Sequence, residues 1–145
     1  RLGKAVLAEA EDLPENLPRV WVDSNKIAHV FANLLSNALK YTSPGGKISV
    51  SAKVEGEVEG GFVRFQVSDT GVGIPSRYLP RLFEQFFRVP EQGPGTGVGL
   101  GLAIVKDIVG AHGGTVGVES RDGTGSTFHF TLRTADHGDI ERRRT

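Results

Sequence analysis

A change of hydrophobic period near residue 44 limits the fold of this chain more than any other feature. Apolar side chains recur at steps of three and four over residues 27–39, which predicts an amphipathic helix with Asp23 as its N-cap. After a Pro-Gly-Gly stop, apolar and polar residues alternate over 48–54 and again over 63–67, which predicts a hairpin. A striped helix and one-sided strands bury their apolar surface against each other, so a two-layer domain is expected.

The pattern in the second half of the chain predicts another helix and more strands. Residues 100–111 are apolar on most sides, which predicts a buried helix that is capped by glycines at 113 and 114. Two more strands are expected in a closing hairpin around a turn at 122–123, and residues 77–87 are expected to be partly helical. Shorter β-like stretches are expected at 4–11 and 20–22. The predicted class is α+β, with helices on one face of a mostly antiparallel sheet.

Composition and length exclude several classes of protein. The 145 residues fit one domain, which we assign to 1–134, followed by a polar and flexible tail at 135–145. With 17 basic and 17 acidic residues, the chain does not have the charge of a nucleic-acid-coating domain or a polybasic membrane binder. The absence of cysteine excludes disulfides and thiolate metal sites. Because the chain begins at Arg1 rather than Met, we expect a fragment of a longer protein.

Three polar side chains share one stripe on the flank of the first predicted helix. Asn33, Asn37 and Lys40 are spaced by four and three residues, so they lie on neighbouring turns. An amide oxygen is a hard ligand for Mg²⁺, and a lysine ammonium is a point charge for phosphate. The stripe indicates a metal–phosphate site, and an ordinary solvated helix flank is the alternative.

A carboxylate and two glycines follow the second strand of the first hairpin. Asp69 at a strand end can accept a hydrogen bond from an exocyclic amine, while Gly71 and Gly73 let the backbone close on a flat ring. This pattern indicates a site for a nucleobase. A type I turn that opens with an aspartate is the alternative.

A glycine-rich run before the second long helix is a third candidate. Repeated glycines at a helix N-terminus offer backbone N–H groups to phosphate. The run lacks the ending of a P-loop and the spacing of a dinucleotide fingerprint. The alternative is a flexible linker. A linker does not need Gly101, however, because a glycine inside a helix costs about 1 kcal/mol relative to alanine.

In this order, these segments resemble the ATP-binding catalytic domain of bacterial sensor histidine kinases. Residues 33–42 (NLLSNALKYT) resemble the N box, 69–75 (DTGVGIP) the first glycine box, 82–88 (LFEQFFR) the F box, 95–102 (GTGVGLGL) the second glycine box and 123–128 (GTGSTF) the last one. Each segment alone is a weak signal, but five of them in order are specific. The resemblance covers residues 4–133. It implies a Bergerat-type fold, a two-layer α/β sandwich with a mixed sheet of about five strands backed by about three helices.

The resemblance also implies roles for the matched residues, with ATP and Mg²⁺ as the bound groups. It makes Asn37 the Mg²⁺ ligand and gives Asn33 and Lys40 catalytic contacts with the metal and the triphosphate. It assigns the adenine amino group to Asp69, with Thr127 beside it through a water molecule. The other implied ATP contacts are Tyr41, Gly71, Gly73, Ile74, Arg88, Gly95, Thr96, Gly97, Val98, Gly99 and Leu100. Residues 88–99 are implied to be a mobile ATP lid, with Arg88 near the γ-phosphate.

The amide at Asn33 separates the branches of this superfamily. The gyrase, mismatch-repair and chaperone ATPases carry a glutamate there as general base, and an amide cannot take that proton. The resemblance therefore implies transfer of the γ-phosphoryl group to a histidine on another domain. The alternatives are a nucleotide-binding scaffold without catalysis, a Ser/Thr-directed kinase of the superfamily and, less compatible with Asn33, a hydrolytic ATPase.

The resemblance implies partners as well. The direct partner is the helical dimerisation and phosphoacceptor domain of the parent protein, and a response regulator is reached through that domain. None of the four histidines of this chain lies in an acceptor motif. We expect a monomeric fragment in the cytoplasm, without contact to nucleic acid or membrane, even where the parent protein is membrane-anchored.

Overall fold

The computed structural model contains the helix and the two hairpins that the hydrophobic periods predict. It describes residues 7–10, 17–18, 20, 22–57, 60–90, 101–121 and 123–135. The elements follow in the order β1 (Leu7–Ala10), α1 (Ser24–Tyr41), β2 (Lys47–Glu55), β3 (Phe62–Asp69), the 3-10 helix η1 (Ser76–Arg81), α2 (Gly101–Ala111), β4 (Val116–Arg121) and β5 (Gly125–Arg133).

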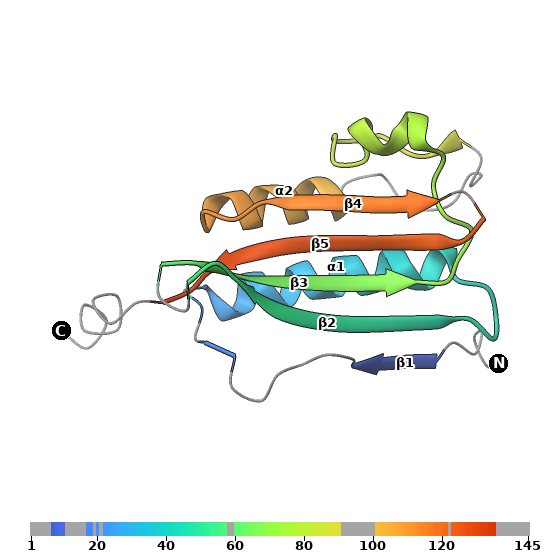
Figure 1. Ribbon diagram of the computed structural model, residues 1–145. Helices are drawn as coiled ribbons and strands as arrows, with labels where there is room; N and C mark the ends of the chain where they lie inside the picture. The colour runs from blue at the N-terminus through green and yellow to red at the C-terminus, as the bar shows by residue number, and fades with distance from the viewer. Residues whose placement is uncertain are drawn as a thin grey trace.

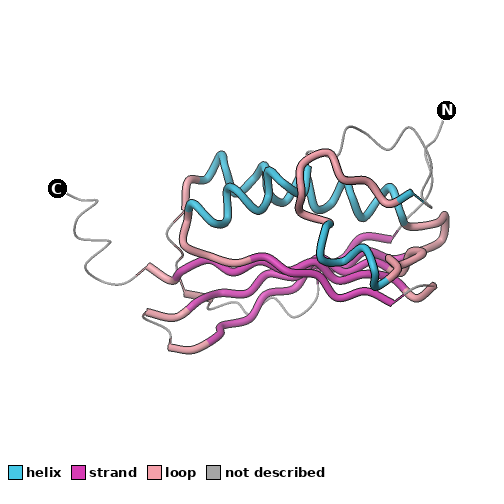
Figure 2. Tube along the Cα trace, turned by 90° about the horizontal axis from the view of Figure 1, so that it is seen from above, coloured by secondary structure: helices cyan, strands magenta, loops and turns pink. Residues whose placement is uncertain are grey.

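The strands form one five-stranded sheet in the order β1–β2–β3–β5–β4. β1 runs parallel to β2, and the other neighbours are antiparallel (Figure 1). Figure 2 shows α1 and α2 side by side on one face of the sheet, and no helix of the described residues covers the other face. The predicted two-layer α/β sandwich with a mixed sheet is therefore confirmed. In the described part, two α-helices and the short η1 accompany the sheet.

Helix α1 begins and ends where local hydrogen bonds set its limits. The Asp23 carboxylate accepts the N–H groups of Asn25 and Lys26, at 2.9 and 3.2 Å, so the predicted N-cap is confirmed. At the other end, the Thr42 hydroxyl donates to the Ala38 carbonyl over 2.7 Å. The helix therefore ends at Tyr41, before the Pro-Gly-Gly segment is reached.

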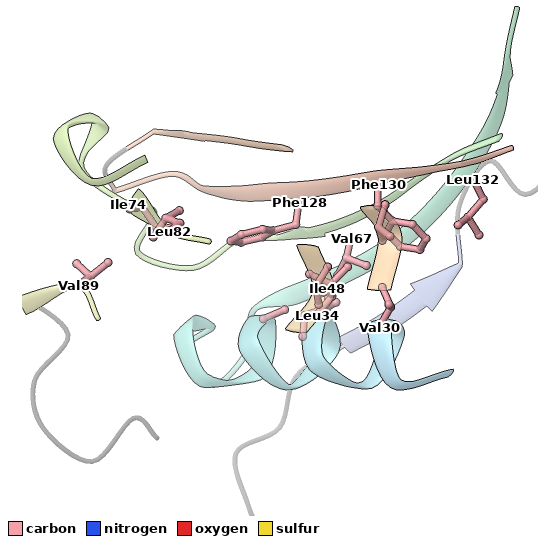
Figure 3. Packing of buried hydrophobic residues seen from close by; sticks show 13 residues of the cluster. Val30, Leu34, Ile48, Val67, Ile74, Leu82, Val89, Phe128, Phe130 and Leu132 are labelled. Carbon is pink, nitrogen blue, oxygen red and sulfur yellow. The ribbon is translucent and has the colours of Figure 1, made fainter. Parts of the chain in front are cut away.

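The core lies between α1 and the sheet. Val30 and Leu34 of α1 point toward Ile48, Val67 and Phe130 of three neighbouring strands (Figure 3), and all five side chains are buried. Burial of an aliphatic or aromatic side chain of this size contributes about 1.5–3 kcal/mol. This packing fixes the face that α1 turns to the sheet, and with it the flank that carries the asparagines.

Helix α2 is buried or half-buried at most of its positions, so the expected buried helix is confirmed except where charged and small residues face solvent. Ala103, Val105 and Val109 are buried, whereas Lys106 and Asp107 are exposed. The helix packs against α1 and the sheet with the apolar side and leaves the charged side to solvent. At its C-terminal end, the predicted glycine cap is confirmed, because Gly113 has a φ of 79° and the next N–H donates back to the Val109 carbonyl.

A histidine joins the ends of the two helices. His112, just after α2, accepts the backbone N–H of Asp23 at Nε2 over 3.1 Å. Its Nδ1 lies 2.7 Å from the Ile108 carbonyl, to which it donates in this tautomer. The C-terminal end of α2 is thus tied to the start of α1, which gives this histidine a structural task.

Several expectations concern the margins of the fold. A strand is expected over residues 20–22; Val20 forms an isolated bridge with Thr134, Val22 lies in no strand, and Trp21 lies outside the described residues. The expected tail lies outside the described residues from position 136 onward, as do residues 91–100 of the expected lid. Among the described residues, no helix has the length and apolar character needed to cross a membrane.

Candidate nucleotide-binding site

Two amides on α1 have buried nitrogen atoms, and one of them faces the start of α2. Asn33 and Asn37 are half-buried, and their Nδ2 atoms are buried without a hydrogen-bond partner among the described residues. Gly101 is the first residue of α2, and a Cβ atom at this position would lie 3.4 Å from Asn33 Oδ1. The Asn33 amide thus lies beside the N-terminal end of α2, which directly follows the glycine-rich run in the sequence.

These unpaired amides fit a metal–phosphate group. Leaving a buried polar group unpaired costs about 1–3 kcal/mol, so each amide favours a partner that a bound group can provide. A side-chain amide offers either an N–H donor to phosphate or an oxygen to a hard cation, depending on how it is turned. The two side chains from successive turns of α1 therefore match the donor set that the sequence indicates.

Asp69 ends β3 with a buried carboxylate. The residue is 7% exposed, and its Oδ1 accepts the N–H of Gly71 over 2.9 Å. Burial raises the pKa of the Asp69 carboxyl above its ordinary value, and the N–H groups of Gly71 and Ser126 offset this rise in part. A buried carboxylate with remaining acceptor positions is suited to pair with a polar donor of a ligand.

The glycine loop, residues 70–75, is fastened to the last turn of α1. The Val72 N–H donates to the Tyr41 carbonyl over 3.3 Å. At Gly71, a Cβ atom would overlap the same carbonyl oxygen, so only glycine permits this approach. Gly73 has a φ of 73°, which also favours glycine. The loop after Asp69 therefore lies one helical turn beyond Asn37.

Gly71→Ala should destabilise the fold by about 2 kcal/mol or more, because the new methyl group meets the Tyr41 carbonyl and forces the loop away from α1. Gly110→Ala is the matched control. No atom lies within 4 Å of a Cβ at Gly110, so alanine there should be neutral or stabilise α2 by up to about 1 kcal/mol. Thermal unfolding measures both effects. Similar melting temperatures for the two variants would refute the close approach.

The C-terminal end of α1 adds a phenol and positive charge to the expected site, through Tyr41, Lys40 and the nearby Arg88. Burial raises the pKa of Tyr41, and the positive charge of Arg88 acts in the opposite direction, so the guanidinium lies near the phenol. Lys40 is exposed one residue earlier on α1. The structure therefore brings the expected residues of the N box and of the F box to the same end of α1.

The structure does not bring Thr127 beside Asp69. Thr127 pairs with Ser68, and its hydroxyl lies 2.9 Å from the Ser68 hydroxyl on the uncovered face of the sheet. Asp69 pairs with Ser126 instead. Successive strand residues point to opposite faces, so the expected neighbour of the carboxylate is displaced by one position.

Some expected contacts lie outside the described residues, and one contact was not foreseen. The first group comprises Gly95, Thr96, Gly97, Val98, Gly99 and Leu100. The unforeseen contact is Ser120, whose hydroxyl receives the Ile74 N–H over 2.7 Å. The alternation of Val116 and Val118 places Ser120 on the helix-facing side of β4, which is the sequence signal that points to it.

The family to which the chain belongs follows from comparison with known proteins. The model described as "Histidine kinase-, DNA gyrase B-, and HSP90-like ATPase" matches residues 22–136. The chain belongs to this ATPase family. The match includes α1, the glycine loop, α2 and the last hairpin, so every part of the candidate site lies within the family's domain.

Similar proteins are sensor histidine kinases. The chain is 40% identical over 121 residues to the adaptive-response sensory kinase SasA of Synechococcus elongatus, covering 83% of this chain and 30% of SasA. It is 41% identical over 123 residues to the sensor histidine kinase WalK of Bacillus subtilis, covering 83% of this chain and 20% of WalK. The chain thus spans less than a third of these relatives, and it is homologous to their ATP-binding catalytic domains.

Solved structures agree with this relationship. The mycobacterial sensor histidine kinase MprB superposes with a TM-score of 0.76 at 32% identity, covering 90% of this chain and 86% of that one. Full-length ShkA in complex with AMPPNP gives a TM-score of 0.72 at 33% identity, covering 92% of this chain and 26% of that one. The expected resemblance to histidine kinases and the expected fold are both confirmed.

Proposed function

We propose that the chain binds Mg-ATP and donates the γ-phosphoryl group to a histidine on a separate helical domain of its parent sensor kinase. The observation that carries this proposal is the pair of amides on α1, Asn33 and Asn37, whose buried Nδ2 atoms have no partner among the described residues, with Asn33 beside the start of α2. Homology to sensor histidine kinases and the AMPPNP complex of ShkA support it.

The glycine loop is the proposed adenine end of the site. Asp69 accepts the adenine amino group, because its buried carboxylate retains acceptor capacity beside the bond from Gly71. Because Gly71 and Gly73 have no side chains, the backbone can lie close to the ring. The buried Ile74 side chain offers an apolar contact.

The proposed phosphate end lies on the flank of α1 that carries Asn33 and Asn37, on the side of the start of α2. Asn37 is the Mg²⁺ ligand, and Asn33 supports the metal and the triphosphate. Lys40, Tyr41 and Arg88 offer donors to the phosphates, together with the backbone N–H groups of residues 95–100. When bound, Mg²⁺ neutralises phosphate charge and orients the leaving group. The chain's own residues hold the triphosphate in position and offer positive charge to it.

By its sequence, the chain has an amide where a general base would stand and no histidine in an acceptor motif. An amide at Asn33 cannot take a proton from water, so hydrolysis should be slow. His112 is engaged in the tie between α1 and α2, and His29 is exposed on α1. The acceptor is therefore proposed to lie on the parent's helical dimerisation and phosphoacceptor domain, which then passes the group to a response regulator. We further propose a monomeric, cytoplasmic fragment without contact to nucleic acid or membrane.

Labelling with radioactive ATP tests the proposal. The chain alone should bind ATP, release little phosphate and carry no label, because phosphoryl transfer needs a nucleophile held in line. Addition of the parent's phosphoacceptor domain should give acid-labile, base-stable phosphohistidine on that domain, and a domain without its histidine should stay unlabelled. Strong labelling or fast turnover of the chain alone would refute the proposal. ATP binding without transfer would favour a scaffold.

A further inference from the structure

The glycine loop is held to the last hairpin at two points. The backbone N–H of Ile74 donates to Ser120 Oγ over 2.7 Å. The N–H of Gly123, in the turn after β4, donates to the Val72 carbonyl over 2.6 Å. The loop is therefore fixed at Val72 to both α1 and the turn after β4, and at Ile74 to β4, where a side chain makes the bond.

The hydroxyl of Ser120 uses its full hydrogen-bonding capacity. Besides the Ile74 N–H, it contacts Ser126 Oγ at 2.8 Å and the Gly125 carbonyl at 3.1 Å. A hydroxyl has one donor and two acceptor positions. Donation to Gly125 and acceptance from Ile74 and Ser126 satisfy all three contacts at once.

The contact of Ser120 with Ser126 leads directly to the carboxylate of the adenine end. Ser120 pairs with Ser126 across β4 and β5, and Ser126 pairs with Asp69 across β5 and β3. The Ser126 backbone N–H is one of two groups that favour the ionised Asp69 carboxylate. The Ser120 hydroxyl therefore links Ile74, near the end of the glycine loop, to Ser126. The Ser126 backbone N–H in turn faces the Asp69 carboxylate just before the loop.

We propose that Ser120 is a positioning residue that sets the affinity for the nucleobase by holding the glycine loop in place around Asp69. This rests on the proposed function, in which Asp69 accepts the adenine amino group. A loop that already has its bound conformation loses less entropy on binding, so the affinity is higher. Without the hydroxyl, the Ile74 N–H loses its partner and the loop samples other conformations.

Ser120→Ala should raise the ATP dissociation constant about tenfold, the upper range for one lost hydrogen bond. The transfer rate at saturating ATP should stay unchanged, because the phosphate end is not touched. In the nucleotide-free protein, amide hydrogen exchange of Ile74 should become faster. Ser120→Thr keeps the hydroxyl and should restore both values. Ser51→Ala, on the opposite face of the sheet with its hydroxyl toward Gln66, is the matched control and should change neither.

A double-mutant cycle separates positioning from general support of the fold. If Ser120 acts through Asp69, the effect of Ser120→Ala should largely vanish in the Asp69→Asn background. An equal loss in both backgrounds overturns the proposal, and so does an unchanged affinity of Ser120→Ala. Should that variant fail to fold, Ser120→Cys fills the same place with a weak acceptor for the Ile74 N–H and should weaken ATP binding in the same direction. An unchanged affinity there also overturns the proposal. A wild-type chain that binds no ATP overturns the proposed function as well.

Discussion

Asp69→Asn should weaken ATP binding about 30-fold or more, which corresponds to about 2 kcal/mol. The carboxylate that is proposed to accept the adenine amino group becomes an amide with a donor or a weaker acceptor at that place. A site that is built to pair a particular polar group discriminates strongly against a mismatched one. For the same reason, the wild-type chain should bind GTP poorly.

The same substitution should leave the fold equally stable or more stable at neutral pH. Burial raises the pKa of the Asp69 carboxyl above its ordinary value of 3.8, so the folded state binds the proton more tightly than the unfolded state. The stability that this proton contributes is present below the ordinary value and is lost as the pH rises through the raised folded pKa. At neutral pH the wild type therefore carries the cost of a buried charge, and the variant does not.

Two measurements check these results for Asp69. Calorimetry with ATP and GTP gives the affinities. Thermal unfolding at several pH values gives the stability of both proteins, and the stability of the wild type relative to Asp69→Asn should fall as the pH rises. Asp107→Asn, on the exposed side of α2, is the matched control and should alter neither quantity. Equal ATP and GTP affinities of the wild type would refute the adenine assignment, and a strongly lowered melting temperature of Asp69→Asn would refute the sign of the stability effect.

Asn37→Ala should reduce phosphoryl transfer by about 100-fold and ATP affinity by no more than about tenfold. Water replaces a lost Mg²⁺ ligand readily, so the nucleotide still binds. The position of the metal is less well defined without the amide, however, and charge in the transition state is less well neutralised. Binding of ADP without metal should hardly change.

The fold should not be weakened by this change, which makes the kinetic effect interpretable. The substitution removes a buried amide that has no partner among the described residues and adds a better helix former to α1. Ser36→Ala, the exposed neighbour on the same helix, is the matched control. The assay is transfer of label to the phosphoacceptor domain at varied Mg²⁺ concentration. Normal transfer by Asn37→Ala would refute the ligand role.

The sequence predicts the elements well where the hydrophobic period is clear. The stripe from Ile27 to Leu39 and the alternation around Val50 and Val67 lead to α1, β2 and β3 as they are found. For α2, the apolar composition predicts burial at most positions correctly, but it does not show that Lys106 and Asp107 are exposed. Composition shows how apolar a helix is, whereas burial depends on what packs against each side.

The sequence indicates which segments form the site, but it does not indicate which residues of neighbouring strands pair with each other. The resemblance puts Thr127 beside Asp69, although the inward alternation of Phe128 and Phe130 already indicates that position 126 faces the helices. The pairing of β3 with β5 decides which residue meets the carboxylate, and such a long-range register is set by tertiary packing rather than by any local pattern. Ser120 was missed because its role exists only in that register.

The tie between His112 and Asp23 joins the two helices at the end that is remote from Asn37. Asn37 lies fourteen residues beyond the tied end of α1, about 21 Å along the helix at 1.5 Å per residue. A small rotation of α2 about its tied end would displace Gly101 much more than residues near the tie. The end that carries the amides is thus the end of the pair at which a given angular change between the helices gives the largest displacement.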